Sequence, residues 1–244
     1  MSIASQLPKN CDVTILGEYL PGDPMDQRYT SQWAGAIWLG TNDATPREQV
    51  MQLGSFAELW RLAERSPESG ARHIEMTEIL DYGSKSDVWF RNKIPGFRAL
   101  RDDELPKGAK VGHKFHTTVI TPPTFLPWFR KHLEERGVSF KRTFVKSLRD
   151  LKGMGHDVLI NATGFGATKL LDVQETKMTP VRQQNIRLRR DGYNRLYIRR
   201  GLNGFYSTAF ARGDGTVYVG GIKTVGSSEF ESSLEQRKKV FSIS

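Results

Sequence analysis

The sequence predicts an α/β protein, α+β overall, that combines a parallel-sheet unit with a second, mixed and largely antiparallel sheet. The first observation is a short apolar run at residues 158–160, between Asp157 and Gly164, which is typical of a buried strand in a parallel sheet. The second is a series of turn-forming pairs after Thr179, which indicates antiparallel strands. These pairs are Asp191-Gly192, Asn203-Gly204 and Asp214-Gly215.

Local patterns assign elements along the first part of the chain. Residues 2–9 are predicted to be the tail of a helix that a proline stops, and residues 12–16 are predicted to form a strand. The polar, turn-rich residues 19–32 follow as a loop. Residues 47–66 place their apolar side chains at helical spacing and predict a helix. Two further strands are expected at residues 72–78 and 88–90.

The middle of the chain returns to alternating helix and strand. Thr121 offers a capping hydroxyl and Pro122 suits a first helical turn, so a helix is predicted from here to Gly137. Strands are predicted at residues 139–145 and 158–160.

The two kinds of pattern interrupt one another, which predicts two domains, the first of them discontinuous. The first comprises residues 1–45 and 138–178, and the second comprises residues 46–137 and 179–230. Residues 231–244 form a divergent tail. A chain of 244 residues with 38% hydrophobic content is long enough for such cores.

Charge and cysteine content narrow the functional classes. The formal net charge is +9, and its excess lies in residues 177–200, where aromatic side chains are interleaved. Such a stretch suits an anionic partner, including a single-stranded nucleic acid, or simply forms a solvated basic sheet face. The lone Cys11 excludes an intrachain disulfide and a cysteine-rich zinc site, so a reducing compartment is the default. No apolar run reaches membrane-spanning length, and no secretory start is recognised.

The turn after residues 158–160 is the strongest candidate for a ligand site. Asn161, Thr163 and Gly164 stand at the carboxyl end of the predicted strand, where open α/β sheets bind ligands. An ordinary strand-to-helix turn is the alternative. Glu18 follows another strand end and could accept hydrogen bonds from a ribose, or be a solvated surface residue.

Several motifs of known chemistry do not occur. The sequence has no GxGxxG loop, no Walker loop, no HExxH and no GxSxG. His113 and His116 lie three residues apart, but no second ligand pair follows, so no metal site is expected.

Spaced sequence blocks resemble D-amino-acid oxidases, particularly those of fungi, from residue 12 to about residue 228. The blocks are DVTILGE at 12–18, YTSQWAGA at 29–36, WFRKHL at 128–133, DVLINATG at 157–164, PVRQQ at 180–184 and GDGTV at 213–217. The resemblance implies a Rossmann-type domain that binds FAD non-covalently and a mixed-sheet substrate domain. It also implies oxidative deamination of D-amino acids by oxygen, which yields a 2-oxo acid, ammonia and hydrogen peroxide.

The resemblance also implies roles for individual residues. Tyr206 matches a tyrosine over the substrate, and Phe210 falls where the family usually has a second tyrosine that helps to hold the substrate carboxylate. The cofactor-binding positions are Glu18 for the ribose, Thr30 and Ser31 near the phosphates, Gly35 and Ala36 at the flavin, Val145 at adenine, and Thr163 and Gly164 in the second cofactor turn.

The chain departs from the family pattern at both ends. Relative to the family it begins inside the first helix, so the first strand with its GxGxxG loop is not included. It stops before the substrate-binding arginine, and residues 229–244 diverge. We therefore expect this chain, partial relative to the family, to bind FAD weakly and to turn over slowly or not at all.

The remaining expectations concern partners and location. D-aspartate oxidase is one alternative, because the basic excess suits a second carboxylate, and a non-catalytic binding protein is another. The leading interpretation predicts an amino-acid substrate and oxygen, possibly a homodimer, and neither nucleic acid nor membrane as a partner. The family is often peroxisomal, so a peroxisomal or cytoplasmic location is expected, although the final Ser-Ile-Ser is no peroxisomal tripeptide.

Overall fold

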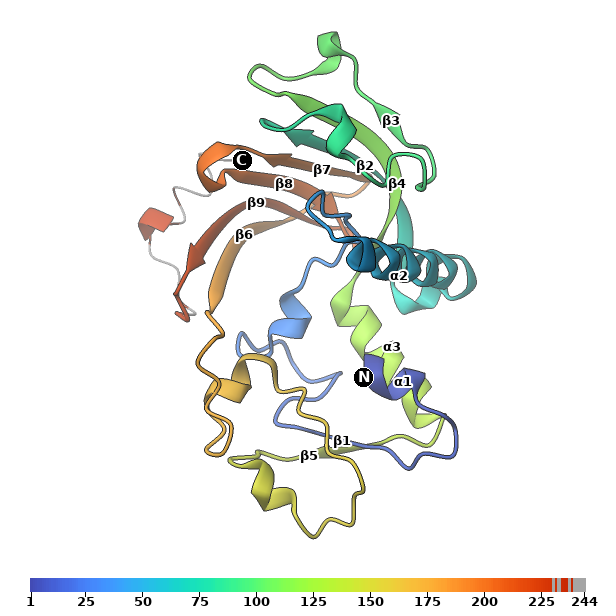
Figure 1. Ribbon diagram of the computed structural model, residues 1–244, viewed down its shortest axis with the longest axis vertical. Helices are drawn as coiled ribbons and strands as arrows, with labels where there is room; N and C mark the ends of the chain where they lie inside the picture. The colour runs from blue at the N-terminus through green and yellow to red at the C-terminus, as the bar shows by residue number, and fades with distance from the viewer. Residues whose placement is uncertain (230, 232–233, 237, 239–244) are drawn as a thin grey trace.

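The computed structural model describes residues 1–229, 231, 234–236 and 238. In this part of the chain, the strands form a two-stranded parallel sheet and a seven-stranded mixed sheet. Figure 1 shows the larger sheet at one end of the molecule and the smaller one at the other. Most of the predicted divergent tail lies outside the described residues.

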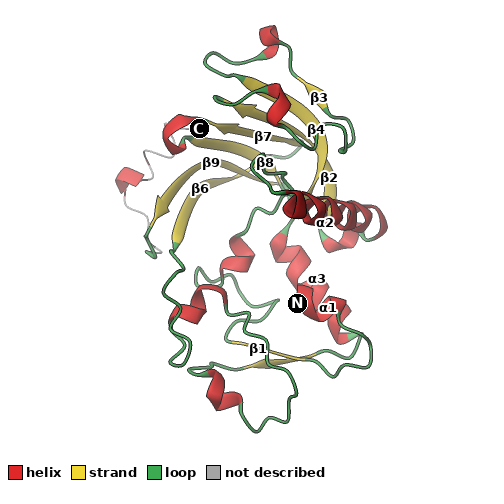
Figure 2. Cartoon of the chain, in the orientation of Figure 1, coloured by secondary structure: helices red, strands yellow, loops and turns green. Residues whose placement is uncertain are grey.

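The larger sheet is curled and mixed, which confirms the predicted fold class (Figure 2). Its strand order is β3-β4-β2-β7-β8-β9-β6, and only the β2–β7 pair is parallel. The strands are β2 (Ala71–Leu80), β3 (Arg98–Ala99), β4 (Val111–Ile120), β6 (Val181–Arg189), β7 (Arg195–Arg200), β8 (Tyr206–Ala211) and β9 (Thr216–Val225).

Two of the three predicted turns connect neighbouring strands. The Asn203-Gly204 and Asp214-Gly215 turns join β7 to β8 and β8 to β9, and both pairs are antiparallel. The Asp191-Gly192 turn follows β6, but β6 pairs with β9 instead of β7. The turn residues identify the change of direction, whereas the partner of β6 is set by the rest of the sheet.

The smaller sheet pairs β1 (Thr14–Gly17) with β5 (Ser139–Arg142) in parallel, as expected for the βα-type part of the chain. Helices α1 (Ser2–Gln6) and α3 (Pro122–Glu134) accompany it. Ala4, Leu133 and Val138 form a small core there.

Helix α2 (Pro46–Arg65) packs on the larger sheet and starts at a capping box. Thr45 accepts from the backbone N–H of Glu48, while the Glu48 carboxylate accepts from the backbone N–H of Thr45. No described helix has the length and hydropathy needed to cross a membrane. The short 3₁₀ helices are η1 (Thr30–Trp33), η2 (Pro67–Ser69), η3 (Lys85–Asp87), η4 (Asp102–Glu104), η5 (Leu148–Leu151), η6 (Gly164–Thr168) and η7 (Leu202–Gly204).

The main hydrophobic core lies on the larger sheet. Phe56 from α2 and Trp38 meet edge to face at 4.8 Å, and both join Met76, Phe90 and Phe115 in one cluster. This aromatic packing fixes the curled sheet against α2.

The prediction of a buried strand at residues 158–160 is wrong. These residues form no strand, and Val158, Leu159 and Ile160 are 75%, 42% and 48% exposed. An apolar run becomes a parallel strand only beside a neighbouring strand, and β1 pairs only with β5 among the described residues. The apolar pattern therefore identified a segment suited to burial, but not a partner for it.

Three other predictions need correction. Residues 88–90 form no strand, although Val88 and Phe90 are buried, because their backbone makes turns at the edge of the core. The Thr121 hydroxyl does not cap α3; it accepts a hydrogen bond from the backbone N–H of Gly213 at 3.0 Å. The ten-residue strand β4 was not predicted at all. The predicted domain boundaries stay a prediction.

Candidate functional site

One predicted cofactor position lies directly against a predicted substrate position. The point where a Cβ on Gly35 would stand is 3.8 Å from Cζ of Phe210. Ala36 exchanges two backbone hydrogen bonds with Ile120, at 3.2 and 2.8 Å, so the segment is tied to the end of β4. The sheet thus brings Gly35 and Ala36 together with a side chain 175 residues later in the sequence.

Phe210 is buried in the sheet and has no hydroxyl to offer. Its ring stacks on Tyr218 of β9, with centroids 5.3 Å apart and planes 14° apart. Tyr218 in turn receives a hydrogen bond from Arg212, whose guanidinium also covers its ring at 4.0 Å. Phe210 therefore contributes packing at the site, whereas the neighbouring Tyr218 supplies a phenol that is already bonded.

Tyr206 lies at the start of β8, four residues before Phe210 and beside charged side chains. It is the register partner of Arg200, and the Lys223 ammonium lies 4.6 Å above its ring. Burial raises the pKa of Tyr206, so its hydroxyl stays protonated at neutral pH. A neutral phenol flanked by cations can donate a hydrogen bond to a carboxylate.

A buried carboxylate, that of Glu78, pairs with Arg200, the register partner of Tyr206. Glu78 on β2 places one carboxylate oxygen 2.9 Å from Nε2 of His113 and the other 3.2 Å from Nε of Arg200. Glu78 and His113 are almost completely buried. Sequence analysis missed this cluster because it considered His113 only as a metal ligand. Among the described residues, no group of three or more metal-binding side chains is present.

Other predicted cofactor positions lie around β1 and β5 and are open to solvent. Glu18 is exposed just after β1, and its backbone carbonyl accepts a 2.8 Å hydrogen bond from Arg142. Thr30 and Ser31 are exposed at the start of η1, and Val145 is half-buried after β5. Exposed carboxylate and hydroxyl groups at strand and helix starts can accept or donate hydrogen bonds to a nucleotide.

The second predicted cofactor turn is ordered by its own polar residues. The Asn161 carboxamide oxygen accepts from the backbone N–H of Thr163 at 3.2 Å and from its hydroxyl at 2.7 Å. Gly164 adopts a φ of +56°, and no atom lies within 4 Å of where its Cβ would stand. The turn therefore leaves the Gly164 backbone open to close approach. No hydrogen bond between described residues links it to Glu18 or Gly35.

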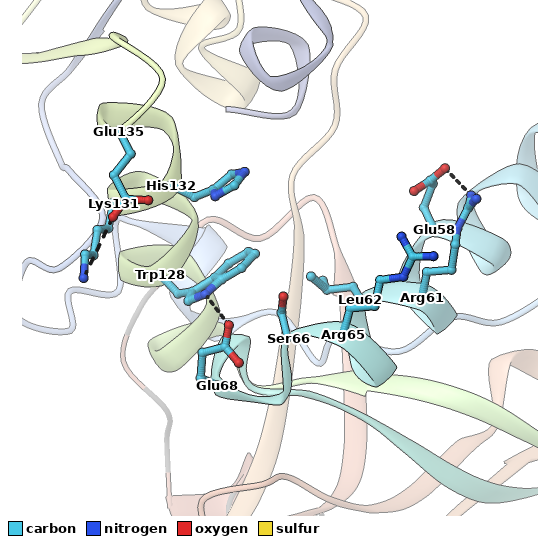
Figure 3. Close-up of a pocket in the computed structure, with 10 residues that line it drawn as sticks. All are labelled: Glu58, Arg61, Leu62, Arg65, Ser66, Glu68, Trp128, Lys131, His132 and Glu135. Atoms are coloured by element: carbon cyan, nitrogen blue, oxygen red, sulfur yellow. Dashed lines mark hydrogen bonds and ion pairs between the residues drawn. The ribbon is translucent and has the colours of Figure 1, made fainter.

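A surface crevice of about 740 Å³ lies elsewhere, between α2 and α3 (Figure 3). Trp128 and His132 stack there at 5.5 Å, and the Trp128 indole donates to Glu68 at 3.3 Å. Its lining residues are Glu58, Arg61, Leu62, Arg65, Ser66, Glu68, Trp128, Lys131, His132 and Glu135. None of the predicted site residues lines it, so the crevice is separate from the site described above.

Comparison with known proteins shows which family the chain matches. The family model for FAD dependent oxidoreductases matches residues 1–241. The chain belongs to this family. Its relatives include a D-amino-acid oxidase from Rubrobacter xylanophilus, 31% identical over 70% of this chain and 52% of the relative. A D-aspartate oxidase from Talaromyces thermophilus is 27% identical over 93% of this chain and 66% of the relative.

A similar fold occurs in a solved structure of the glycine oxidase from Geobacillus kaustophilus. It matches with a TM-score of 0.69 and 13% identity, over 96% of this chain and 70% of that one. Among the curated relatives, the chain spans 52% of the length of the oxidase from Rubrobacter xylanophilus and 66% of that of a D-amino-acid oxidase from Fusarium vanettenii.

The residues present fit the cofactor that the family is named for. Glu18 presents an exposed carboxylate, Thr30 and Ser31 present exposed hydroxyls, and Gly164 presents an open backbone. The Gly35 backbone lies beside the Phe210 ring, which brings a predicted cofactor position next to a predicted substrate position. The individual assignments stay predictions.

Proposed function

We propose that this protein takes part in the FAD-dependent oxidative deamination of D-amino acids, with oxygen as the electron acceptor. The products are a 2-oxo acid, ammonia and hydrogen peroxide. The observation that carries the proposal is the position of the Gly35 segment beside the Phe210 ring of the curled sheet, within a family of FAD dependent oxidoreductases. A D-amino-acid oxidase among its relatives supports the choice of substrate.

In this proposal, one group of residues binds the cofactor and another binds the substrate. When bound, FAD supplies the redox chemistry, since it accepts the hydride from the substrate α-carbon. Glu18 would accept hydrogen bonds from its ribose, Thr30 and Ser31 would hold its phosphates, and the Val145 backbone would meet the adenine. Gly35, Ala36, Thr163 and Gly164 would offer it backbone with little side-chain bulk.

The substrate side relies on orientation rather than on a side-chain base. Tyr206 donates a hydrogen bond to the substrate carboxylate, and Phe210 packs beside it. Compared with a tyrosine at position 210, one hydrogen bond of about 0.5–1.5 kcal/mol is not made. For a substrate whose amine is neutral, these side chains would need only to hold it in the correct orientation, and no side-chain base would be required.

A titration with FAD tests the proposal. The purified 244-residue chain is titrated while visible absorbance and flavin fluorescence are recorded, and D-alanine is then added without oxygen. We expect weak but saturable binding, because residues 158–160 beside the second cofactor turn are exposed, followed by bleaching of the oxidised flavin band. L-alanine serves as the control. Bound flavin that no D-amino acid reduces would contradict the oxidase proposal, and tight stoichiometric flavin would contradict weak binding.

An acidic D-amino acid is the second candidate substrate. Lys223 lies 4.6 Å above the Tyr206 ring, and Arg200 is the register partner of Tyr206, so cations flank the predicted substrate position. A relative named D-aspartate oxidase supports this candidate. We expect Lys223→Met to weaken reduction by D-aspartate more than reduction by D-alanine. Equal effects on both substrates would favour the neutral D-amino acids.

A non-catalytic binding role is the remaining alternative, based on the basic stretch at residues 177–200. Nucleic-acid binding that weakens steeply with salt, in a chain that binds no flavin, would support it instead of the oxidase. A peroxisomal or cytoplasmic location and a homodimer are further proposals, which fluorescence imaging and sedimentation would test.

A further inference from the structure

We propose that Arg212 is a positioning residue that fixes the cofactor-facing segment 34–36 against the substrate side of the sheet. This inference rests on the proposed function, because it assigns that segment to the flavin. The hydrogen bonds of Arg212 go to two backbone carbonyls and one phenol of the protein. It acts through the backbone that it holds.

Arg212 makes hydrogen bonds in three directions with one guanidinium. Its Nε donates to the carbonyl of Gly35 at 2.8 Å, and Nη2 donates to the carbonyl of Ala34 at 2.5 Å. Its Nη1 donates to the hydroxyl of Tyr218 at 2.9 Å. One planar group therefore joins the segment to β9, the strand that stacks Tyr218 on Phe210.

The charge on Arg212 is buried, and the nearby carboxylate of Asp214 offsets it only from beyond ion-pair distance. The residue is only 3% exposed, and within the described part of the chain it forms no ion pair. Its partners are neutral: two carbonyls, one phenol hydroxyl and one aromatic face. Burial lowers the pKa of Arg212 from its usual value, yet an arginine remains protonated at neutral pH. Burying a charge without an ion pair lowers the stability of the fold. The hydrogen bonds of Arg212 therefore serve to position segment 34–36 rather than to stabilise the protein.

Two sets of hydrogen bonds hold segment 34–36. Only the set from Arg212 connects the segment to the stretch of chain that carries Phe210. Ala36 pairs with Ile120 on β4, which ties the segment to the scaffold. Arg212 lies two residues after Phe210 on the same stretch of chain, so its bonds set the spacing between Gly35 and Phe210. A lysine has one nitrogen and no planar fork, so it would not reach both carbonyls and the phenol together.

The test compares Arg212 with a neighbouring arginine. Arg72 is also partly buried and donates to the carbonyl of Ala211 at 3.0 Å, but it makes no hydrogen bond to segment 34–36. The variants are Arg212→Met, Arg212→Lys and the matched control Arg72→Met. For each one, three quantities are measured: the FAD dissociation constant, the visible circular dichroism of bound flavin, and amide exchange at Ala36 and Ile120. Urea unfolding reports the loss of stability of each variant.

We expect Arg212→Met to weaken FAD binding about tenfold or more, since it removes hydrogen bonds made by a charged group. The flavin dichroism should change, and exchange at Ala36 and Ile120 should speed up. Arg212→Lys should restore only part of each effect. Arg72→Met should lower stability but leave flavin binding within about twofold of wild type, because it does not touch the segment.

Two outcomes would overturn the inference. One is a loss of FAD affinity that follows stability equally in the Arg212 and Arg72 variants. The other is unchanged exchange at Ala36 and Ile120 in Arg212→Met, which needs no flavin to be measured. Failure of the wild-type chain to bind any FAD would instead refute the proposed cofactor role of the segment, and with it the positioning role.

Discussion

The two sheets of this protein differ in how completely they bury their own apolar side chains. In the seven-stranded sheet, β2 and β4 pair over ten residues, and Phe90 and Phe115 are inaccessible to solvent. Around the two-stranded sheet, β1 and β5 pair over only four residues, and the apolar residues 158–160 remain largely exposed.

This difference separates two kinds of site. Tyr206, Phe210 and Arg212 stand on a sheet with a continuous core, so their positions are fixed by packing. Glu18, Thr163 and Gly164 stand on segments with few buried neighbours, held mostly by local hydrogen bonds. We expect the substrate side to be rigid and the cofactor side to depend more on the ligand for its order.

The largest expected effect contrasts one phenylalanine from each region. Phe115 is fully buried in the larger sheet, whereas Phe144, just after β5, is 66% exposed. Phe115→Ala should lower the free energy of unfolding by about 3–5 kcal/mol, because it leaves a cavity. Phe144→Ala should change it by less than about 0.5 kcal/mol. Urea unfolding followed by circular dichroism measures both, and similar losses would remove the contrast between the regions.

The second prediction concerns the buried acid of the larger sheet. Glu78→Leu should destabilise the protein by about 3 kcal/mol, because it leaves the cation of Arg200 without its partner. The control is the exposed pair of Lys85 and Asp102, where Asp102→Asn should cost less than about 0.5 kcal/mol. If both substitutions lower the free energy of unfolding equally in urea, the Glu78 cluster stabilises the protein no more than an exposed ion pair does.

Local sequence patterns predicted the elements that depend on local interactions. The helical spacing at residues 47–66 predicted α2 (Pro46–Arg65) to within one residue, because this periodicity is encoded locally. The apolar run at 158–160 failed for the opposite reason, since burial of a parallel strand depends on distant neighbours.

The same distinction applies to the site. Family resemblance identified Gly35 and Phe210 separately, but only the folded chain reveals that the Gly35 backbone lies beside the Phe210 ring. Arg212 was missed because its bond to Gly35 spans 177 residues of sequence. The Glu78–His113 pair was missed because β4, the strand that carries His113, was not predicted and the histidine was considered only as a metal ligand.

The third prediction tests the helix that covers the larger sheet. Thr45→Ala removes the hydroxyl that caps α2, so the protein should lose about 1 kcal/mol of stability. Thr45→Ser keeps the capping oxygen and should cost no more than a few tenths of a kcal/mol. Thermal unfolding of the two variants compares them directly, and equal melting temperatures would exclude a stabilising cap.

The smallest expected effect belongs to the smaller sheet and depends on pH. Two hydrogen bonds from Arg142, at 2.8 and 2.6 Å, and one from the Leu20 N–H hold the pKa of Asp23 at about 2. In the unfolded chain the pKa of an aspartate is about 4, so the pair stabilises the fold above pH 4. That contribution is lost as the pH falls from about 4 to about 2. Because Arg142 is largely exposed, we expect less than about 1 kcal/mol.

Asp23→Asn provides the comparison, since it keeps the shape of the side chain and removes the titration. Wild type should lose more stability than the variant between pH 5 and pH 2, with the difference confined to that interval. Amide exchange at Thr143, which donates to the Gly17 carbonyl at 3.0 Å, would report the smaller sheet specifically. Identical pH profiles for the two proteins would mean that the Asp23–Arg142 pair does not hold β1 and β5 together. The stability of this sheet would then depend on the backbone pairing of β1 with β5 and on the small core of Ala4, Leu133 and Val138.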